Sequence, residues 1–203
     1  MGKAEFICKR CGGRGQYETV PAVNCSTSPE LKEKLLSGEL FIHECPHCGA
    51  RNLVTFPLLY HDPQERLMIW LSDGQAATEQ RMRAAVASED FAPYTGRIVD
   101  TPGQLIEKIK IFDAGLDDRA LEIAKFVTRQ ELAKDVDLLF FGIDGADHEI
   151  TLTYPADGDM QIVRIGFSVY EDSAAILQRN PDIKNSATGL ARVDRGWISK
   201  FFG

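Results

Sequence analysis

Two copies of a Cys-x-x-Cys-Gly element, at residues 8–12 and 45–49, place the strongest constraint on this chain. Two residues between the cysteines let both sulfurs of a turn point at one ion, and the following glycine supplies the positive φ that closes the turn. Two such turns complete a tetrahedral shell of four sulfurs, which suits Zn²⁺ and leaves no open position for water. The sequence therefore predicts one structural zinc ion per chain, held by Cys8, Cys11, Cys45 and Cys48.

Two other chemistries use the same residues. The tetrapeptide Cys45-Pro-His-Cys48 is also the active-site sequence of thiol oxidants of the DsbA type, which place the first cysteine at the N-terminus of a helix. Residues 49–57 are instead typical of a turn and a strand, and a redox role leaves the pair at residues 8 and 11 unexplained. Iron is the second alternative, because rubredoxin-type sites also use four thiolates and ligand softness does not separate the two metals.

Three neighbouring residues are expected to stay outside the metal shell. His43 and His47 flank the second element, but four sulfurs already fill the shell. Cys25 stands alone and is expected to pack as a small apolar thiol. The N-terminus lacks the apolar core of a signal peptide, so we expect a reducing, cytoplasmic compartment in which a disulfide framework does not form.

Composition places the chain among ordinary globular proteins. It has 203 residues, of which 44% are hydrophobic and 26% charged, enough for one large or two small domains. No apolar run approaches the roughly 20 residues that span a bilayer, so no membrane association is expected. The formal net charge of −7 divides into −1 for residues 1–75 and −6 for residues 76–203, and the acidic second part disfavours contact with a phosphate backbone.

The first part of the chain is predicted to be a zinc-ribbon-like β module, residues 1–74, with one inserted helix. The helix spans residues 29–36, with Ser28 as its N-cap and Pro29 at its first position. Strands are expected at residues 52–56 and 66–71, joined by a turn at residues 60–63. His61 and Asp62 fall on that turn, where Asp62 is expected to cap the backbone and His61 to be a surface or packing residue.

Residues 75–203 are predicted to form an α+β domain. A helix at 75–88 precedes a helix hairpin, in which the first helix starts with Thr101 and Pro102 and the second with Asp117 or Asp118. Strands at 136–143, 149–153 and 160–167 form an antiparallel meander, followed by C-terminal helices at 168–179 and after residue 194. The acidic group at residues 144–149 is expected to be a hairpin turn.

Several stretches resemble the bacterial CpXC-domain family. They are residues 29–36, Cys45-Pro-His-Cys-Gly49, the specific run Pro57-Leu-Leu-Tyr-His-Asp-Pro63, and Leu67-Met-Ile-Trp-Leu71, together with Asn24. The similarity extends over residues 1–130, roughly. It implies a family defined by four cysteines, which correspond here to Cys8, Cys11, Cys45 and Cys48, and it assigns no reaction.

The sequence shows no catalytic constellation and no open metal position, so we expect a non-catalytic module that binds a protein partner or a second copy of itself. The alternative is nucleic-acid binding through the ribbon, because four basic residues surround the cysteines: Lys9, Arg10, Arg14 and Arg51. Four thiolates with Zn²⁺ leave a formal charge of about −2, which weakens that alternative. An active site assembled only in the fold stays open.

Overall fold

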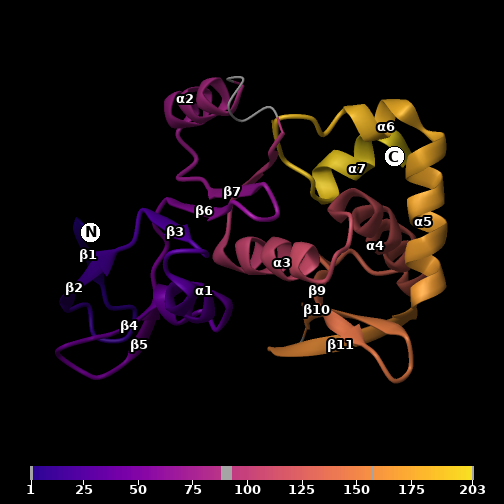
Figure 1. Ribbon diagram of the computed structural model, residues 1–203. Helices are drawn as coiled ribbons and strands as arrows, with labels where there is room; N and C mark the ends of the chain where they lie inside the picture. Colours follow the sequence, from indigo (N-terminus) through magenta and orange to yellow (C-terminus); the bar gives the residue numbers. More distant parts are fainter. Residues whose placement is uncertain (1, 88–92, 157, 203) are drawn as a thin grey trace. The chain divides into compact units, whose positions relative to one another are not determined.

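The computed structural model describes residues 2–87, 93–156 and 158–202. The chain divides into two compact units, Met1–Ile106 and Glu107–Gly203, which we call the first and second units (Figure 1). Helices and separate antiparallel and mixed sheets occur together, which confirms the predicted α+β class. The first unit extends beyond residue 74, and the end of the zinc-ribbon-like module at that position stays a prediction.

Two antiparallel hairpins and one short helix build the N-terminal part of the first unit. The helix α1 spans Pro29–Leu36, as the sequence predicts, with Pro29 in its first turn. Ser28 occupies the N-cap position, but its side chain makes no capping hydrogen bond. The elements in this part are β1 (Gly2–Ile7), β2 (Arg14–Thr19), β3 (Ala22–Asn24), α1, the 3₁₀ helix Glu39–Phe41, β4 (Ile42–Glu44) and β5 (Arg51–Leu53).

A mixed sheet forms the core of the first unit. Its strands lie in the order β8 (Thr95–Val99), β7 (Leu67–Leu71), β6 (Leu58–Asp62) and β3. The central pair β6–β7 is antiparallel, whereas β3–β6 and β7–β8 are parallel. All five residues of β7 are buried, which explains its unbroken apolar run. The helix α2 (Ala76–Val86) connects β7 to β8 along the chain.

The turn that precedes β7 lies at residues 63–66, so the predicted position at residues 60–63 is wrong. Leu58, Tyr60 and Asp62 alternate on the buried face of β6, and the chain turns only after Asp62. Successive side chains of a strand point to opposite faces, so every second residue is buried when one face is covered. The strand β3, which lies much earlier in the sequence, pairs with β6 and places Val23 opposite Tyr60. This pairing also stabilises residue 60 in the strand.

The second unit contains a three-stranded meander and a group of helices. The strands β9, β10 and β11 are antiparallel and lie in the order β11-β10-β9, as the sequence predicts. The helix α3 contains the boundary between the two units. The elements are α3 (Pro102–Asp113), α4 (Asp118–Leu132), β9 (Leu139–Asp144), β10 (Glu149–Ala156), β11 (Asp159–Gly166), α5 (Phe167–Arg179), α6 (Pro181–Asn185), β12 (Leu190–Ala191) and α7 (Arg195–Phe202).

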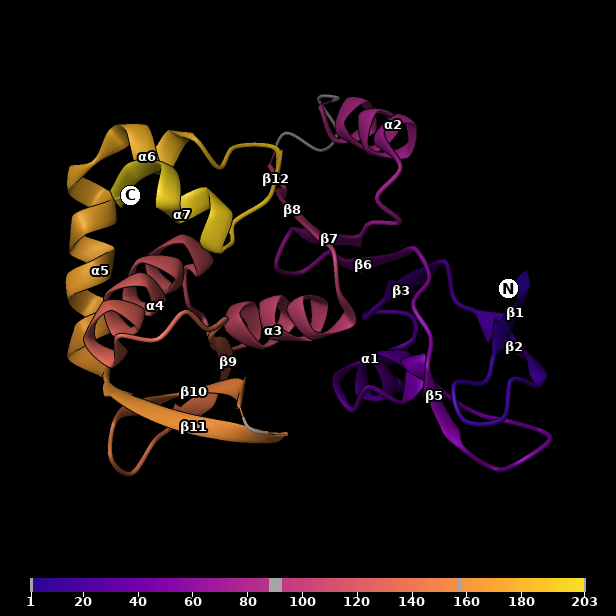
Figure 2. The same ribbon diagram turned by 180° about the vertical axis from the view of Figure 1, so that it is seen from behind.

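The helix α4 is the centre of the second unit because it is buried on two sides. Leu121 and Ala124 belong to the apolar cluster of the meander, which includes Leu152 of β10. Ala120 and Ile123 belong to a second cluster with residues of α5 and α7. Both views show α4 and α5 side by side (Figure 1, Figure 2). Within the described ranges, no helix is long and apolar enough to cross a membrane.

Candidate metal centre

The two Cys-x-x-Cys-Gly elements lie at the ends of the hairpins β1–β2 and β4–β5, and their four sulfurs meet. These four cysteines are called the four-cysteine cluster: Cys8, Cys11, Cys45 and Cys48. All four sulfurs lie within 4.8 Å of one another. Two sulfur–sulfur separations join one element to the other, at 3.7 Å for Cys8–Cys48 and 3.6 Å for Cys11–Cys45. These distances exclude disulfides, whose sulfurs lie about 2.05 Å apart, and all four cysteines are free.

The two elements share one backbone hydrogen-bond pattern. In each, the amide of the first cysteine, Cys8 or Cys45, donates to the carbonyl oxygen five residues later, at 2.8 and 2.9 Å. The carbonyl oxygen of the same cysteine accepts from the amide of the glycine four residues later, at 2.9 Å in both elements. These glycines, Gly12 and Gly49, have φ of 72° and 67°, the left-handed region that the sequence predicts for them.

Asn52 of β5 connects the two elements. Its side-chain amide donates to the sulfur of Cys8 over 3.6 Å, and its side-chain oxygen accepts from the backbone amide of Lys9 over 3.1 Å. Asn52 is only 5% exposed, so these partners replace water. Asn52 is not among the residues predicted from the sequence. The available signal was an amide side chain on the strand directly after the second element, where an apolar residue is more usual.

Neighbouring groups shift the pKa values of Cys8 and Cys11 in opposite directions. The backbone amide of Cys11 donates to the sulfur of Cys8 and lowers its pKa to about 6, against the opposing effect of burial. The amide of Gly13 acts in the same direction on Cys11, but hydrogen bonding with Cys48 and burial outweigh it and raise the Cys11 pKa to about 12. Four adjacent sulfurs cannot all be thiolates without a cation to offset their charge. This donor set therefore fits a soft metal ion, which would stabilise all four thiolates.

The nearby histidines and Cys25 lie outside the four-cysteine cluster. His43 Nε2 lies 3.3 Å from the carbonyl oxygen of Leu40, and His47 Nε2 lies 3.1 Å from that of Arg14, so each ring hydrogen-bonds the backbone. Cys25 is half-buried, and its burial raises the thiol pKa. Among the described residues, the four cysteines are the group whose ligand atoms could hold an ion.

Access to the four-cysteine cluster is uneven. Cys8 and Cys45, the first cysteine of each element, are 2% and 3% exposed, whereas Cys11 is exposed.

Arg14 makes a weak surface ion pair with Glu5 at 3.9 Å. The four basic residues that surround the cysteines in the sequence are all exposed: Lys9, Arg10, Arg14 and Arg51.

Two further sequence candidates are the last two residues of β6. Asp62 Oδ1 accepts from the backbone amides of Gln64 and Glu65, both at 3.1 Å, so it caps the turn after β6 as expected. His61 lies 3.3 Å from the hydroxyl of Tyr94 through its Nε2 and packs against that ring. In the acidic hairpin, Asp144 accepts from the amide of Ala146 at 2.9 Å, which is ordinary turn chemistry.

Comparison with protein families agrees with the paired elements. The family model described as CpXC protein matches residues 6–125, more than half of the chain. The chain belongs to the CpXC family. The match includes all four cysteines of the cluster and continues through β8 and α3 into α4. Neither the curated proteins nor the solved structures contain a match.

Proposed function

We propose that the four-cysteine cluster binds one Zn²⁺ as a structural ion. The observation that carries this proposal is the pair of sulfur separations, 3.7 and 3.6 Å. A tetrahedron with Zn–S bonds of about 2.3 Å has edges of about 3.8 Å, so an ion fits with little movement. Four thiolates close the shell and leave no site for a reacting water, which makes the role structural. The ion joins two hairpins that are each only two strands wide, and such hairpins are marginal alone.

Elemental analysis of the purified full chain tests the proposal. We expect one zinc per chain and a colourless protein. Iron in its place would give visible charge-transfer absorption and would overturn the choice of metal, whereas a folded, metal-free protein would overturn the site itself. Cys11→Ser should lose most of the metal, because it removes one of four thiolates. The matched control Cys25→Ser should retain it, because Cys25 lies outside the cluster.

The local fold supports a structural ion over thiol–disulfide exchange. Cys45 is followed by a turn and by β5, not by a helix whose dipole would stabilise its thiolate. Titration of free thiols with and without a chelator separates the two functions. We expect chelation to release four reactive thiols, whereas a low-pKa thiol that reacts in the metal-loaded protein would favour redox chemistry.

The wider function that we propose is a non-catalytic module that binds a protein partner, including a second copy of the chain. The support lies on β11, an outer strand of the meander. Met160 and Ile162 project from it with 56% and 60% of their surface exposed, two residues apart and so on one face. An outer strand with exposed apolar side chains is a template for pairing with another strand.

Light scattering coupled to size exclusion tests self-association at β11. We expect a dimer or a larger assembly that Ile162→Lys converts to monomer. Gln161→Lys is the matched control, because Gln161 is also exposed but lies on the other face of the strand. A wild-type monomer at high micromolar concentration would overturn self-association. A separate protein partner would then be tested by pull-down, and it should bind the wild type but not Ile162→Lys.

The second candidate function is nucleic-acid binding, which the exposed basic residues around the cluster favour. Lysine and arginine at such a surface can meet phosphates, and their contribution falls as salt rises. Binding of a mixed-sequence DNA or RNA that weakens with salt and is lost in Arg10→Glu would support it. Binding that is absent at low salt would exclude it.

A further inference from the structure

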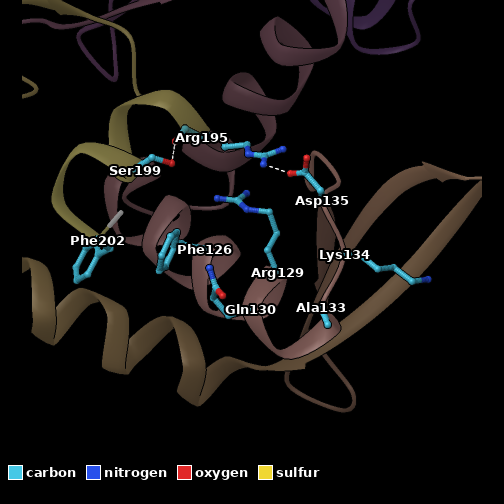
Figure 3. Close-up of a pocket in the computed structure, with 9 residues that line it drawn as sticks. All are labelled: Phe126, Arg129, Gln130, Ala133, Lys134, Asp135, Arg195, Ser199 and Phe202. Atoms are coloured by element: carbon cyan, nitrogen blue, oxygen red, sulfur yellow. Dashed lines mark hydrogen bonds and ion pairs between the residues drawn. The ribbon is translucent and has the colours of Figure 1, made fainter.

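A cavity of about 400 Å³ lies in the second unit, and none of its lining residues belongs to the four-cysteine cluster (Figure 3). The last turns of α4, the residues that follow it and the helix α7 form its walls. Its volume is within the range of sites for small molecules. The residues that line it are Phe126, Arg129, Gln130, Ala133, Lys134, Asp135, Arg195, Ser199 and Phe202.

Three cations and one carboxylate line this cavity, and one of the cations has a buried nitrogen that no acceptor in the described part of the chain reaches. Arg195 is offset, because its guanidinium pairs with Asp135 and lies 3.5 Å from an oxygen of Asp137. Lys134 donates to the hydroxyl of Tyr154 at 3.1 Å and points away from the cavity (Figure 3). Arg129 is different.

The Arg129 side chain is 7% exposed, and its terminal nitrogen Nη2 is buried without a hydrogen-bond partner among the described residues. Its guanidinium extends into the space between α7 and the end of α4 (Figure 3). Burial is the main reason why the pKa of Arg129 is lowered, and the nearby Arg195 acts in the same direction. Glu122 and the carboxylates at residues 135 and 137 act in the opposite direction but do not outweigh these effects. A buried donor without an acceptor carries the full desolvation penalty, so an acceptor from outside the chain would relieve it.

The remaining walls suit an apolar group. The rings of Phe126 and Phe202 pack with centroids 5.5 Å apart and form one side of the cavity. Phe202 is 40% exposed, so part of its surface is available for contact. The amide of Gln130 lies on the same wall as Arg129 and can donate to an anion.

We propose that this cavity binds a small molecule in which a carboxylate or phosphate group is attached to an aromatic or other apolar group. The Arg129 guanidinium holds the oxyanion, since its planar fork of N–H donors matches two oxygens of either group. The ring pair of Phe126 and Phe202 contacts the apolar part. The site is independent of the metal and of the partner surface proposed above.

Calorimetric titration of the full, metal-loaded chain tests this site with phenyl phosphate, benzoate, inorganic phosphate and benzyl alcohol at constant ionic strength. We expect saturable binding of phenyl phosphate or benzoate, weaker binding of inorganic phosphate and no binding of benzyl alcohol. The stronger of the two aromatic anions identifies the headgroup. Absence of saturable binding for all three anions would overturn the proposal.

Variants separate this site from a structural role of Arg129. Arg129→Met should weaken aromatic-anion binding at least about tenfold, the effect of losing a charge-assisted hydrogen bond. Arg179→Met, at an exposed position in the last turn of α5, should bind as wild type. If Arg129→Met does not fold, Phe202→Ala should reduce phenyl phosphate affinity to that of inorganic phosphate. Unchanged affinity in either cavity variant would contradict the assignment.

Discussion

The side-chain amide of Asn52 lies 3.6 Å from the sulfur of Cys8, a residue 44 positions earlier in the chain. The same amide nitrogen donates to the carbonyl oxygen of Ala50 at 2.7 Å, and the side-chain oxygen accepts from Lys9. Asn52 therefore fixes the strand after the second element to the turn of the first element. These hydrogen bonds orient the two hairpins relative to each other without the help of an ion.

We expect Asn52→Ala to weaken metal binding by about 10- to 100-fold, the usual effect of removing a hydrogen bond to a metal ligand. Asn52→Asp should weaken it at least as much, because a carboxylate cannot donate to the sulfur and adds negative charge. Competition with a chromophoric chelator measures both. Asn185→Ala, at an exposed position in α6, is the control and should bind metal as wild type does. Equal affinities for all four proteins would show that Asn52 has no role at the metal.

Removal of the metal should affect the two units differently. We expect a strong chelator to abolish hydrogen-exchange protection in β1, β2, β4 and β5, because the proposed ion joins these hairpins. Protection in α4 and the meander should persist, since that unit has its own apolar clusters. Some contact between the hairpins would remain, since Tyr17 packs against His43 with ring centroids 5.0 Å apart. Hydrogen exchange read by mass spectrometry resolves these segments, and equal loss of protection in both units would contradict this expectation.

Features of the fold that depend on neighbouring residues were predictable from the sequence. Thr101 accepts from the amide of Gln104, whose side chain accepts in return from Thr101 and Asp100, so the predicted capping box is present. Asp194 likewise accepts from the amide of Trp197 at the start of α7, the helix predicted after residue 194. In such cases the donor and the acceptor lie within four residues of each other, so the pattern contains the whole interaction.

Features that depend on distant residues were not predictable in the same way. The parallel pairing of β3 with β6 joins residues far apart, and no local pattern indicates it. The start of α5 was also misplaced by one residue: the helix was expected from residue 168, but it begins at Phe167 after Gly166. The four-cysteine cluster was predictable because the spacing of its residues is itself the signal. Asn52 and Arg129 were not, since their roles come from groups brought close by the fold.

Tyr170 gives the second unit a dependence on alkaline pH. Its hydroxyl oxygen accepts from the amide of Asp117 at 2.8 Å, and burial is the main cause of a raised pKa. Because the folded state keeps the phenol proton more tightly than the unfolded state, the unfolded state loses it first as pH rises above about 10. The contribution of Tyr170 to the free energy of unfolding should therefore be fully present below about pH 10 and decline above it.

Tyr170→Phe tests that dependence through urea unfolding followed by the circular dichroism of the full chain. At pH 7 we expect it to reduce the free energy of unfolding by about 1 kcal/mol, because the amide of Asp117 loses its acceptor. Between pH 9 and pH 11 the variant should lose less stability than wild type. An equal decline in the two proteins would mean that Tyr170 titrates alike in the folded and unfolded states.

Lys125 holds two buried carboxylates on different helices of the second unit. Its Nζ lies 2.9 Å from Glu107 of α3 and also pairs with Glu122 of α4. Glu107 in turn accepts from the backbone amide of Phe140 at 2.7 Å, which connects α3 to the meander. Lys125 is 3% exposed, and the carboxylates raise its pKa despite the opposing effect of burial. The ion pairs therefore orient α3, α4 and β9 together.

Lys125→Met should reduce the free energy of unfolding by about 3–5 kcal/mol, because it leaves two buried carboxylates without their shared cation. The double variant Lys125→Met with Glu122→Leu should recover part of that loss, since it removes one of the two buried carboxylates. Arg83→Met is the control: its pair with Glu79 is on the surface at 4.0 Å and should cost about 0.5 kcal/mol or less. Chemical denaturation of the four proteins at one pH measures these differences. A loss in Lys125→Met no larger than that in Arg83→Met would show that the buried pairs contribute no more than a surface pair.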